Sequence, residues 1–201
     1  MAHHPLRLTL DGGALISNWR WLAAMSGGAA CGAAVKADGY GLGAREAVAR
    51  LKAAGCRDFF VATWAEAEAL GPWHGDGAGA LSVLHGVAGD DMAAALASSA
   101  RPVLNSPEQV ARWRGTGRPC DVMVDTGMSR LGVSAADVAG GLLDGLAIET
   151  LMSHLACADE DSPANAAQRD SFVAVAGKVT AKRLSLATAP ASALARIMRS
   201  A

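Results

Sequence analysis

The stretch Ala33-Ala-Val-Lys-Ala-Asp-Gly-Tyr-Gly-Leu-Gly43 places one lysine at the end of an apolar run and follows it with alternating glycines. Such a pattern predicts a buried strand that gives way to a loop, with Lys36 at the strand end. A lysine amine attacks carbonyl carbons in its neutral form, which apolar surroundings favour. The stretch therefore predicts an amine suited to imine chemistry, with the glycines and Tyr40 beside an anionic group. The alternative is an ordinary surface lysine just past a strand.

Outward from this stretch, short apolar runs alternate with longer alanine-rich segments, the pattern of βα units around a parallel sheet. Strands are expected at 32–36, 58–62, 80–84, 101–104, 121–124, 148–154 and 183–187. Helices are expected at 46–54, 64–70, 90–98, 107–114, 135–141 and 165–180. Asn105-Ser-Pro-Glu and Asp161-Ser-Pro-Ala-Asn each pair an N-cap residue with a proline, which is typical of a helix start.

Seven βα units predict an α/β fold, a (β/α)8 TIM-type barrel that is one strand short, because a closed barrel of this kind has eight strands. An open doubly wound sheet is the alternative. The glycines at 39, 41 and 43 do not form the Gly-x-Gly-x-x-Gly of a dinucleotide-binding fold, and no helix is expected to start within them.

Composition narrows the function classes. The 201 residues are 51% hydrophobic and 18% charged, which indicates a globular chain. The net charge of −1 and scattered basic residues argue against nucleic acid or anionic lipid as a partner and favour a small neutral or zwitterionic ligand. No membrane segment or signal peptide is evident, so a cytoplasmic location is expected. Four cysteines without CxxC pairing predict reduced, mostly buried thiols and no metal site.

Two further motifs follow predicted strands. Val124-Asp-Thr-Gly-Met-Ser-Arg-Leu-Gly132 carries Arg130, whose guanidinium suits a phenolate or a carboxylate. The alternative is a turn in which Asp125 and Thr126 satisfy the backbone and Arg130 pairs on the surface. Met152-Ser-His-Leu-Ala-Cys-Ala-Asp-Glu160 carries His154, which could lie against an aromatic ligand or be a structural side chain. Asp159 and Glu160 are expected to solvate the loop or to cap the next helix.

Together these motifs closely resemble alanine racemase, the pyridoxal-phosphate enzyme of bacterial wall synthesis. In that family they read approximately Val-Val-Lys-Ala-Asn-Ala-Tyr-Gly-His-Gly, Val-Asp-Thr-Gly-Met-x-Arg-Leu-Gly and Thr-His-Phe-Ala-x-Ala-Asp-Glu. The segment Asp11-Gly-Gly-Ala-Leu-Ile-Ser-Asn18 also resembles the family's opening Asp-x-x-Ala-Leu-x-x-Asn. The resemblance extends from about Leu8 to about Ala187, with order and spacing in agreement.

The resemblance implies a role for each matching residue. Lys36 bonds covalently to pyridoxal 5'-phosphate and serves as one of two bases that move the α-proton of alanine between its L- and D-forms. Tyr40 binds the cofactor phosphate, Arg130 contacts the phenolic oxygen and neighbours the substrate carboxylate, and His154 packs beside the pyridine ring. Two positions differ: Asp38 replaces the usual Asn, and Met123 replaces a lysine that in many members orients the arginine.

The C-terminal part departs from the family, which continues with a phosphate-binding Asn-Ser and then an Arg-Pro-Gly. Here Thr188-Ala-Pro-Ala-Ser192 is what a one-base deletion in GC-rich codons for Asn-Ser-Ala-Gly-Ile produces. We therefore expect a racemase N-terminal barrel at 1–187 and an out-of-frame tail at 188–201, without the last strand and the β-rich second domain. In the family that domain supplies, from the partner subunit of a homodimer, the tyrosine that is the second base. Little racemase activity and doubtful dimerisation are expected of the chain alone.

Two rival functions stay open at this point. One is a stand-alone pyridoxal-phosphate barrel of the cofactor-homeostasis type, or a related decarboxylase. The other is a non-enzymatic pseudogene product. Tyr40-Gly-Leu-Gly and Asp125-Thr-Gly-Met-Ser-Arg favour the racemase.

Overall fold

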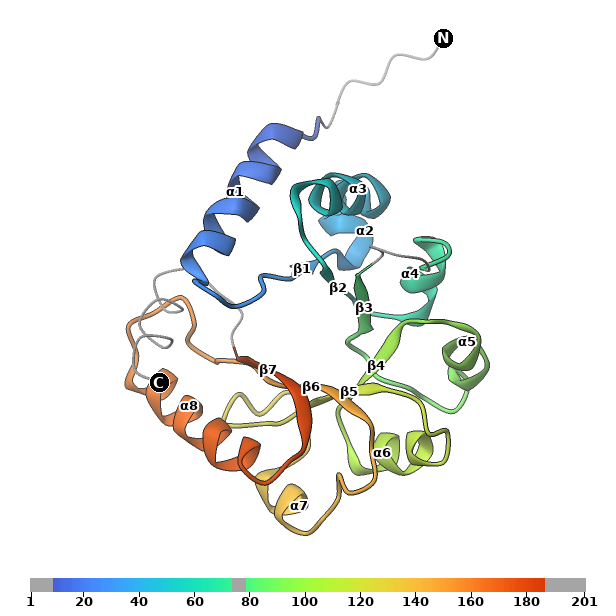
Figure 1. Ribbon diagram of the computed structural model, residues 1–201, viewed down its shortest axis with the longest axis vertical. Coiled ribbons are helices and arrows are strands. Elements are labelled where there is room, and N and C mark those ends of the chain that lie inside the picture. Colours follow the sequence, from blue (N-terminus) through green and yellow to red (C-terminus); the bar gives the residue numbers. More distant parts are fainter. Residues whose placement is uncertain (1–8, 74–78, 187–201) are drawn as a thin grey trace.

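The computed structural model describes residues 9–73 and 79–186, and within them seven parallel strands form one curled sheet in the order of the sequence. The strands are β1 (Ala33–Ala34), β2 (Asp58–Val61), β3 (Ala80–Val83), β4 (Arg101–Leu104), β5 (Cys120–Met123), β6 (Ile148–Ser153) and β7 (Ala181–Leu186). β1 and β7 lie at the two ends of the sheet, so the described part of the chain is an incomplete (β/α)8 barrel (Figure 1).

Helices surround the outside of the curled sheet (Figure 1). They are α1 (Gly12–Met25), α2 (Lys36–Tyr40), α3 (Ala44–Ala54), α4 (Trp64–Ala69), α5 (Met92–Ala97), α6 (Pro107–Arg114), α7 (Ala135–Ala139) and α8 (Pro163–Ala176). Ser106 and Ser162 cap α6 and α8 with a proline in the first turn, as the sequence predicted. None of the described helices is long and apolar enough to cross a membrane.

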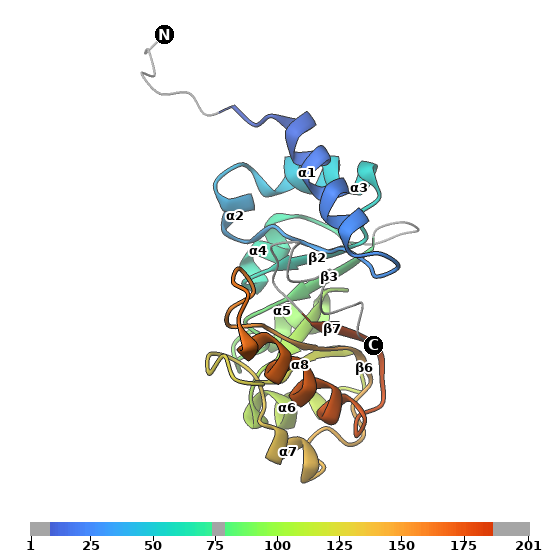
Figure 2. The same cartoon turned by 90° about the vertical axis from the view of Figure 1, so that its left-hand side faces the viewer.

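The predicted strands are confirmed to within two residues at most ends, and the structure differs from the sequence prediction near the N-terminal end. α1 was not anticipated, although Asp11 caps it and it packs against α3 (Figure 2). The predicted strand at 32–36 ends at Ala34, and Lys36 begins a single helical turn. α3 begins at Ala44, directly behind the last glycine of that stretch and within two residues of the predicted helix start at 46. Ala187 and the tail 188–201 lie outside the described residues.

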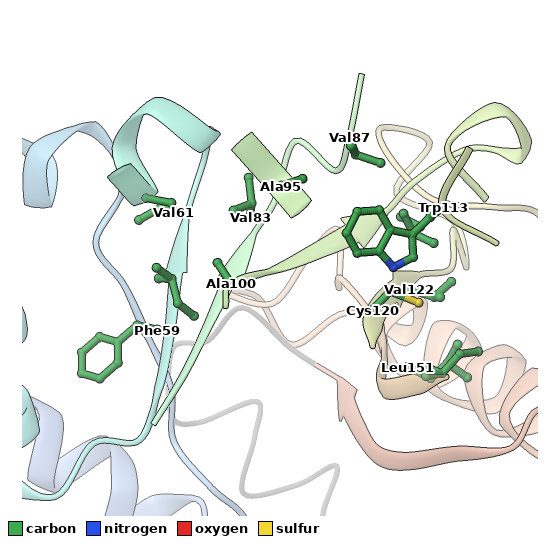
Figure 3. Packing of buried hydrophobic residues seen from close by; sticks show 14 of the residues in the cluster. Phe59, Val61, Val83, Val87, Ala95, Ala100, Trp113, Cys120, Val122 and Leu151 are labelled. Carbon is green, nitrogen blue, oxygen red and sulfur yellow. The ribbon is translucent and has the colours of Figure 1, made fainter. Parts of the chain in front are cut away.

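The main apolar core lies between the sheet and its helices. Phe59, Val61, Val83 and Leu151 belong to this core, and Trp113 of α6 lies beside Cys120 and Val122 (Figure 3). Cys56 and Cys120 are buried there, and burial raises the pKa of the Cys56 thiol to about 11 and that of Cys120 to about 12. All four cysteines are free thiols, two of them buried and two half-buried.

The other face of the strands, which faces the inside of the curl, is layered. Because alternate strand residues share a face, one residue per strand contributes to each layer. Toward the amino ends lies a polar layer of linked side chains: Asp58, Ser82, Arg101, Asp121, Thr150 and Arg183. Two residues further along the strands lies an apolar layer of Phe60, Leu84, Val103, Met123 and Met152. The carboxyl ends of the strands follow, and they carry the predicted site.

Candidate functional site

Three of the predicted site residues lie at the carboxyl edge of the sheet. Lys36 follows β1, Arg130 belongs to the loop after β5, and His154 comes directly after β6. In barrels of parallel strands the carboxyl ends meet at one rim, which is where side chains from distant parts of the sequence converge. The fold therefore assembles residues that are separated by more than a hundred positions in the chain.

The turn that begins at Lys36 is left-handed. Ala37, Asp38 and Tyr40 have φ values of 51°, 49° and 57°, a conformation that costs an L-residue with a side chain about 1–2 kcal/mol. The amide of Gly39 donates to the carbonyl of Val35 at 2.9 Å, which closes the turn. The sequence predicted only a loop here, because positive φ at three residues with side chains is uncommon.

Asp38, which replaces the family's usual Asn, does not add a free charge to the site. Its Oδ1 accepts a hydrogen bond from the amide of Ala44 at 2.8 Å, at the first residue of α3. A carboxylate at a helix N-terminus is favourable because it satisfies an unpaired amide and complements the helix dipole. Asp38 thus helps to join the left-handed turn to α3.

The imidazole of His154 is held in a neutral, unsatisfied state. Its Nδ1 is buried and has no hydrogen-bond partner among the described residues. Burial lowers the pKa of His154 below its usual 6.5, and the positive charges of Arg130 and then Lys36 lower it further. The three side chains are therefore close enough to interact electrostatically, and His154 keeps a buried ring nitrogen without a hydrogen-bond partner among the described residues.

The loop that carries Arg130 is held by hydrogen bonds to its own backbone amides. Asp125 Oδ1 accepts from the amides of Gly127 and Ser129 at 2.9 and 3.0 Å, so the predicted backbone role of Asp125 is present. Thr126 bonds instead to the hydroxyl of Ser153 at 2.7 Å. The side chain of Arg130 is exposed and makes no ion pair or hydrogen bond within residues 9–73 and 79–186.

Met123, at the position where the resemblance implies a lysine, lies in the apolar layer beneath this rim and is 4% exposed. A thioether donates no hydrogen bond and carries no charge, so it cannot orient a guanidinium. This agrees with the unpaired state of Arg130.

Tyr40 is more exposed than Lys36 and His154. It ends the left-handed turn, its side chain is 62% exposed, and its hydroxyl has no hydrogen-bond partner in the described parts of the chain. The structure therefore brings Lys36, Arg130 and His154 together, and it gives no contact of the Tyr40 side chain with them among the described residues.

Two residues that the sequence analysis did not single out hold this edge together. Glu66 of α4 accepts hydrogen bonds from the amides of Ala37 and Ala62, and Gln168 of α8 bonds to the backbone of His154 and Ala156. Thr63-x-x-Glu66 has the spacing of a capping box, which was the available signal. That pattern indicates a bond to the N-cap residue, however, and not to a neighbouring strand.

Comparison with known proteins agrees with this architecture. The family described as "Alanine racemase, N-terminal domain" matches residues 10–200. The chain belongs to the alanine racemase family. It is 44% identical over 199 residues to an alanine racemase of Acidiphilium cryptum, covering 92% of this chain and 54% of the relative. It is also 44% identical over 177 residues to a catabolic alanine racemase of Mesorhizobium japonicum, covering 82% of this chain and 46% of the relative.

A solved alanine racemase from Bartonella henselae with covalently bound pyridoxal phosphate superimposes with a TM-score of 0.78 at 27% identity. That match covers 89% of this chain and 58% of the other. The chain thus spans about half the length of its racemase relatives.

Proposed function

We propose that this chain is the pyridoxal-phosphate-binding barrel of an alanine racemase, with Lys36 as the residue that bonds to the cofactor. The cofactor supplies an electron sink that makes the α-proton of an amino acid removable. The observation that carries the proposal is the convergence of Lys36, Arg130 and the neutral His154 at one rim of the barrel.

The residues at the rim fit such a group chemically. Pyridoxal phosphate carries a phosphate, a phenolic oxygen and an aromatic ring, and the rim offers two cations without anionic partners in the described residues. The guanidinium of Arg130 suits the phenolic oxygen and the carboxylate of alanine. The neutral His154 ring offers a buried, unpaired nitrogen, and the phenol of Tyr40 is free to donate to the phosphate.

For the whole racemase, we infer that Lys36 moves the proton on one face of the α-carbon. Inversion needs a second base on the opposite face, because removing and returning a proton on one face restores the original centre. A partner subunit of a homodimer supplies that base in this proposal. The enzyme would act in the cytoplasm and provide D-alanine for peptidoglycan. The 201 residues alone are expected to exchange the α-proton slowly and to racemise little.

Cofactor binding tests the proposal directly. Pyridoxal phosphate titrated into the 201-residue chain should produce a visible absorption band that Lys36→Ala abolishes. Lys178→Ala is the matched control, since Lys178 is exposed and lies before β7 at the opposite edge of the sheet. Borohydride reduction followed by peptide mass mapping should place the cofactor on Lys36. Labelling that is equal in the Lys36→Ala variant would refute the assignment.

A further inference from the structure

Three side chains near the starts of helices join the carboxyl ends of neighbouring strands in pairs. Glu66 joins β1 to β2, Gln109 joins β3 to β4, and Gln168 joins β5 to β6. Each reaches from the helix that follows the second strand of its pair, α4, α6 or α8. We call these three residues the strand clips.

The first clip acts next to Lys36. Glu66 Oε1 accepts from the amide of Ala37 at 2.9 Å, and Oε2 accepts from the amide of Ala62 at 2.6 Å. Charge-assisted hydrogen bonds of this kind are about twice as strong as neutral ones. Ala37 is the first residue of the left-handed turn, so Glu66 ties the backbone beside Lys36 to the end of β2.

The third clip acts on His154 and on the loop that carries Arg130. Gln168 is only 4% exposed, and its Nε2 donates to the carbonyl of His154 at 2.9 Å and to Thr126 Oγ1 at 3.3 Å. Its Oε1 accepts from the amide of Ala156 at 2.8 Å. One buried amide therefore holds both strand ends that contribute Arg130 and His154.

The second clip has the same form but serves none of these residues. Gln109 Oε1 accepts from the amide of Asn105 at 2.9 Å, and its Nε2 donates to the carbonyl of His85 at 3.0 Å. The clips at both ends of the series touch the site, and the middle one does not. A comparison of Gln109 with Glu66 and Gln168 therefore distinguishes a contribution to the stability of the barrel from a contribution to the site.

We propose that Glu66 and Gln168 are positioning residues, which set the placement of Lys36 and of the His154–Arg130 pair for cofactor binding. This inference rests on the proposed function. Glu66→Gln keeps the shape but leaves one acceptor for two amides, and Gln168→Met keeps the length but loses all three bonds. Gln109→Met is the control, because it loses the two side-chain hydrogen bonds of Gln109 away from the site.

The test measures the free energy of unfolding and the Kd for pyridoxal phosphate for all three variants. We expect Glu66→Gln and Gln168→Met to raise Kd about tenfold, which is about 1.4 kcal/mol, and Gln109→Met to change it less than twofold. If the affinity for pyridoxal phosphate fell equally in all three variants, the strand clips would act only through the stability of the barrel, and the proposal would be overturned. An unchanged Kd in Glu66→Gln and Gln168→Met would also overturn it.

A second measurement needs no cofactor, so it tests the positioning roles independently of the proposed function. In the cofactor-free protein, amide exchange at Ala37 should accelerate in Glu66→Gln, and the NMR titration of His154 should move in Gln168→Met but not in Gln109→Met. If the wild-type chain fails to bind pyridoxal phosphate, the proposed function fails and these two measurements decide the positioning roles alone. An unmoved His154 titration and unchanged Ala37 exchange would then overturn them.

Discussion

Within the described parts of the chain, charged side chains are paired at one end of the barrel interior and unpaired at the other. Toward the amino ends of the strands, Arg183 donates to Asp58 at 2.7 and 3.1 Å and Arg101 lies 3.3 Å from Asp121. At the carboxyl ends, Lys36 and Arg130 have no anionic partner in the described residues, and His154 keeps an unpaired nitrogen. The paired charges are satisfied within the chain, whereas the unpaired charges at the rim can add to stability when an anionic ligand binds to them.

The strongest test of this contrast removes Asp121. Its carboxylate is 0% exposed and also accepts from Ser82 at 2.6 Å, so Asp121→Ala leaves Arg101 half-buried without its partner. Breaking a buried pair costs about 3–5 kcal/mol. Urea unfolding should show that loss, while Lys36→Met in the cofactor-free protein should change stability by less than about 1 kcal/mol. Similar losses at the two ends would contradict the contrast.

A smaller effect is expected at the pair that links the two flanks of the sheet. Arg183 of β7 reaches Asp58 of β2, and also Thr150 at 3.3 Å. Arg183→Met should cost about 1–2 kcal/mol, because part of the guanidinium is in water and screened. The loss should shrink at high salt. A cost that is independent of salt would indicate lost packing of the arginine stem in place of lost charge pairing.

The smallest effect is a pH dependence from His154. Its folded pKa is below 6.5, so as the pH falls through 6.5 the unfolded chain binds a proton that the folded chain refuses. The contribution to stability is intact above pH 6.5 and is lost on acidification toward the folded pKa. His154→Gln should flatten the stability profile between about pH 7.5 and about pH 5 relative to wild type.

The charge next to His154 can be tested in the same way. Arg130→Gln removes one positive charge that lowers the pKa of His154, so the NMR titration midpoint should rise toward 6.5. An unmoved midpoint would show that Arg130 does not face the imidazole in solution.

Local pattern predicted the fold well, because most strands contain a short apolar run bounded by glycine, proline or polar residues. It also placed Lys36, Arg130 and His154 at strand ends, where the structure has them. The local sequence pattern could not predict contacts between segments that are far apart in the chain. Arg183 and Asp58 are 125 residues apart, and Gln168 and Thr126 are 42 apart, so no spacing rule connects them. The left-handed turn was missed because Ala37 and Asp38 individually disfavour it.

That turn also has a consequence for chirality. A D-residue is the mirror image of an L-residue, so the backbone angles that strain L-alanine at position 37 are the ones D-alanine prefers. Chemical synthesis with D-residues at positions 37 and 38 would therefore relieve backbone strain. At most other positions of the chain a D-residue would introduce strain. Beside Lys36, the polypeptide already adopts the hand of the opposite enantiomer.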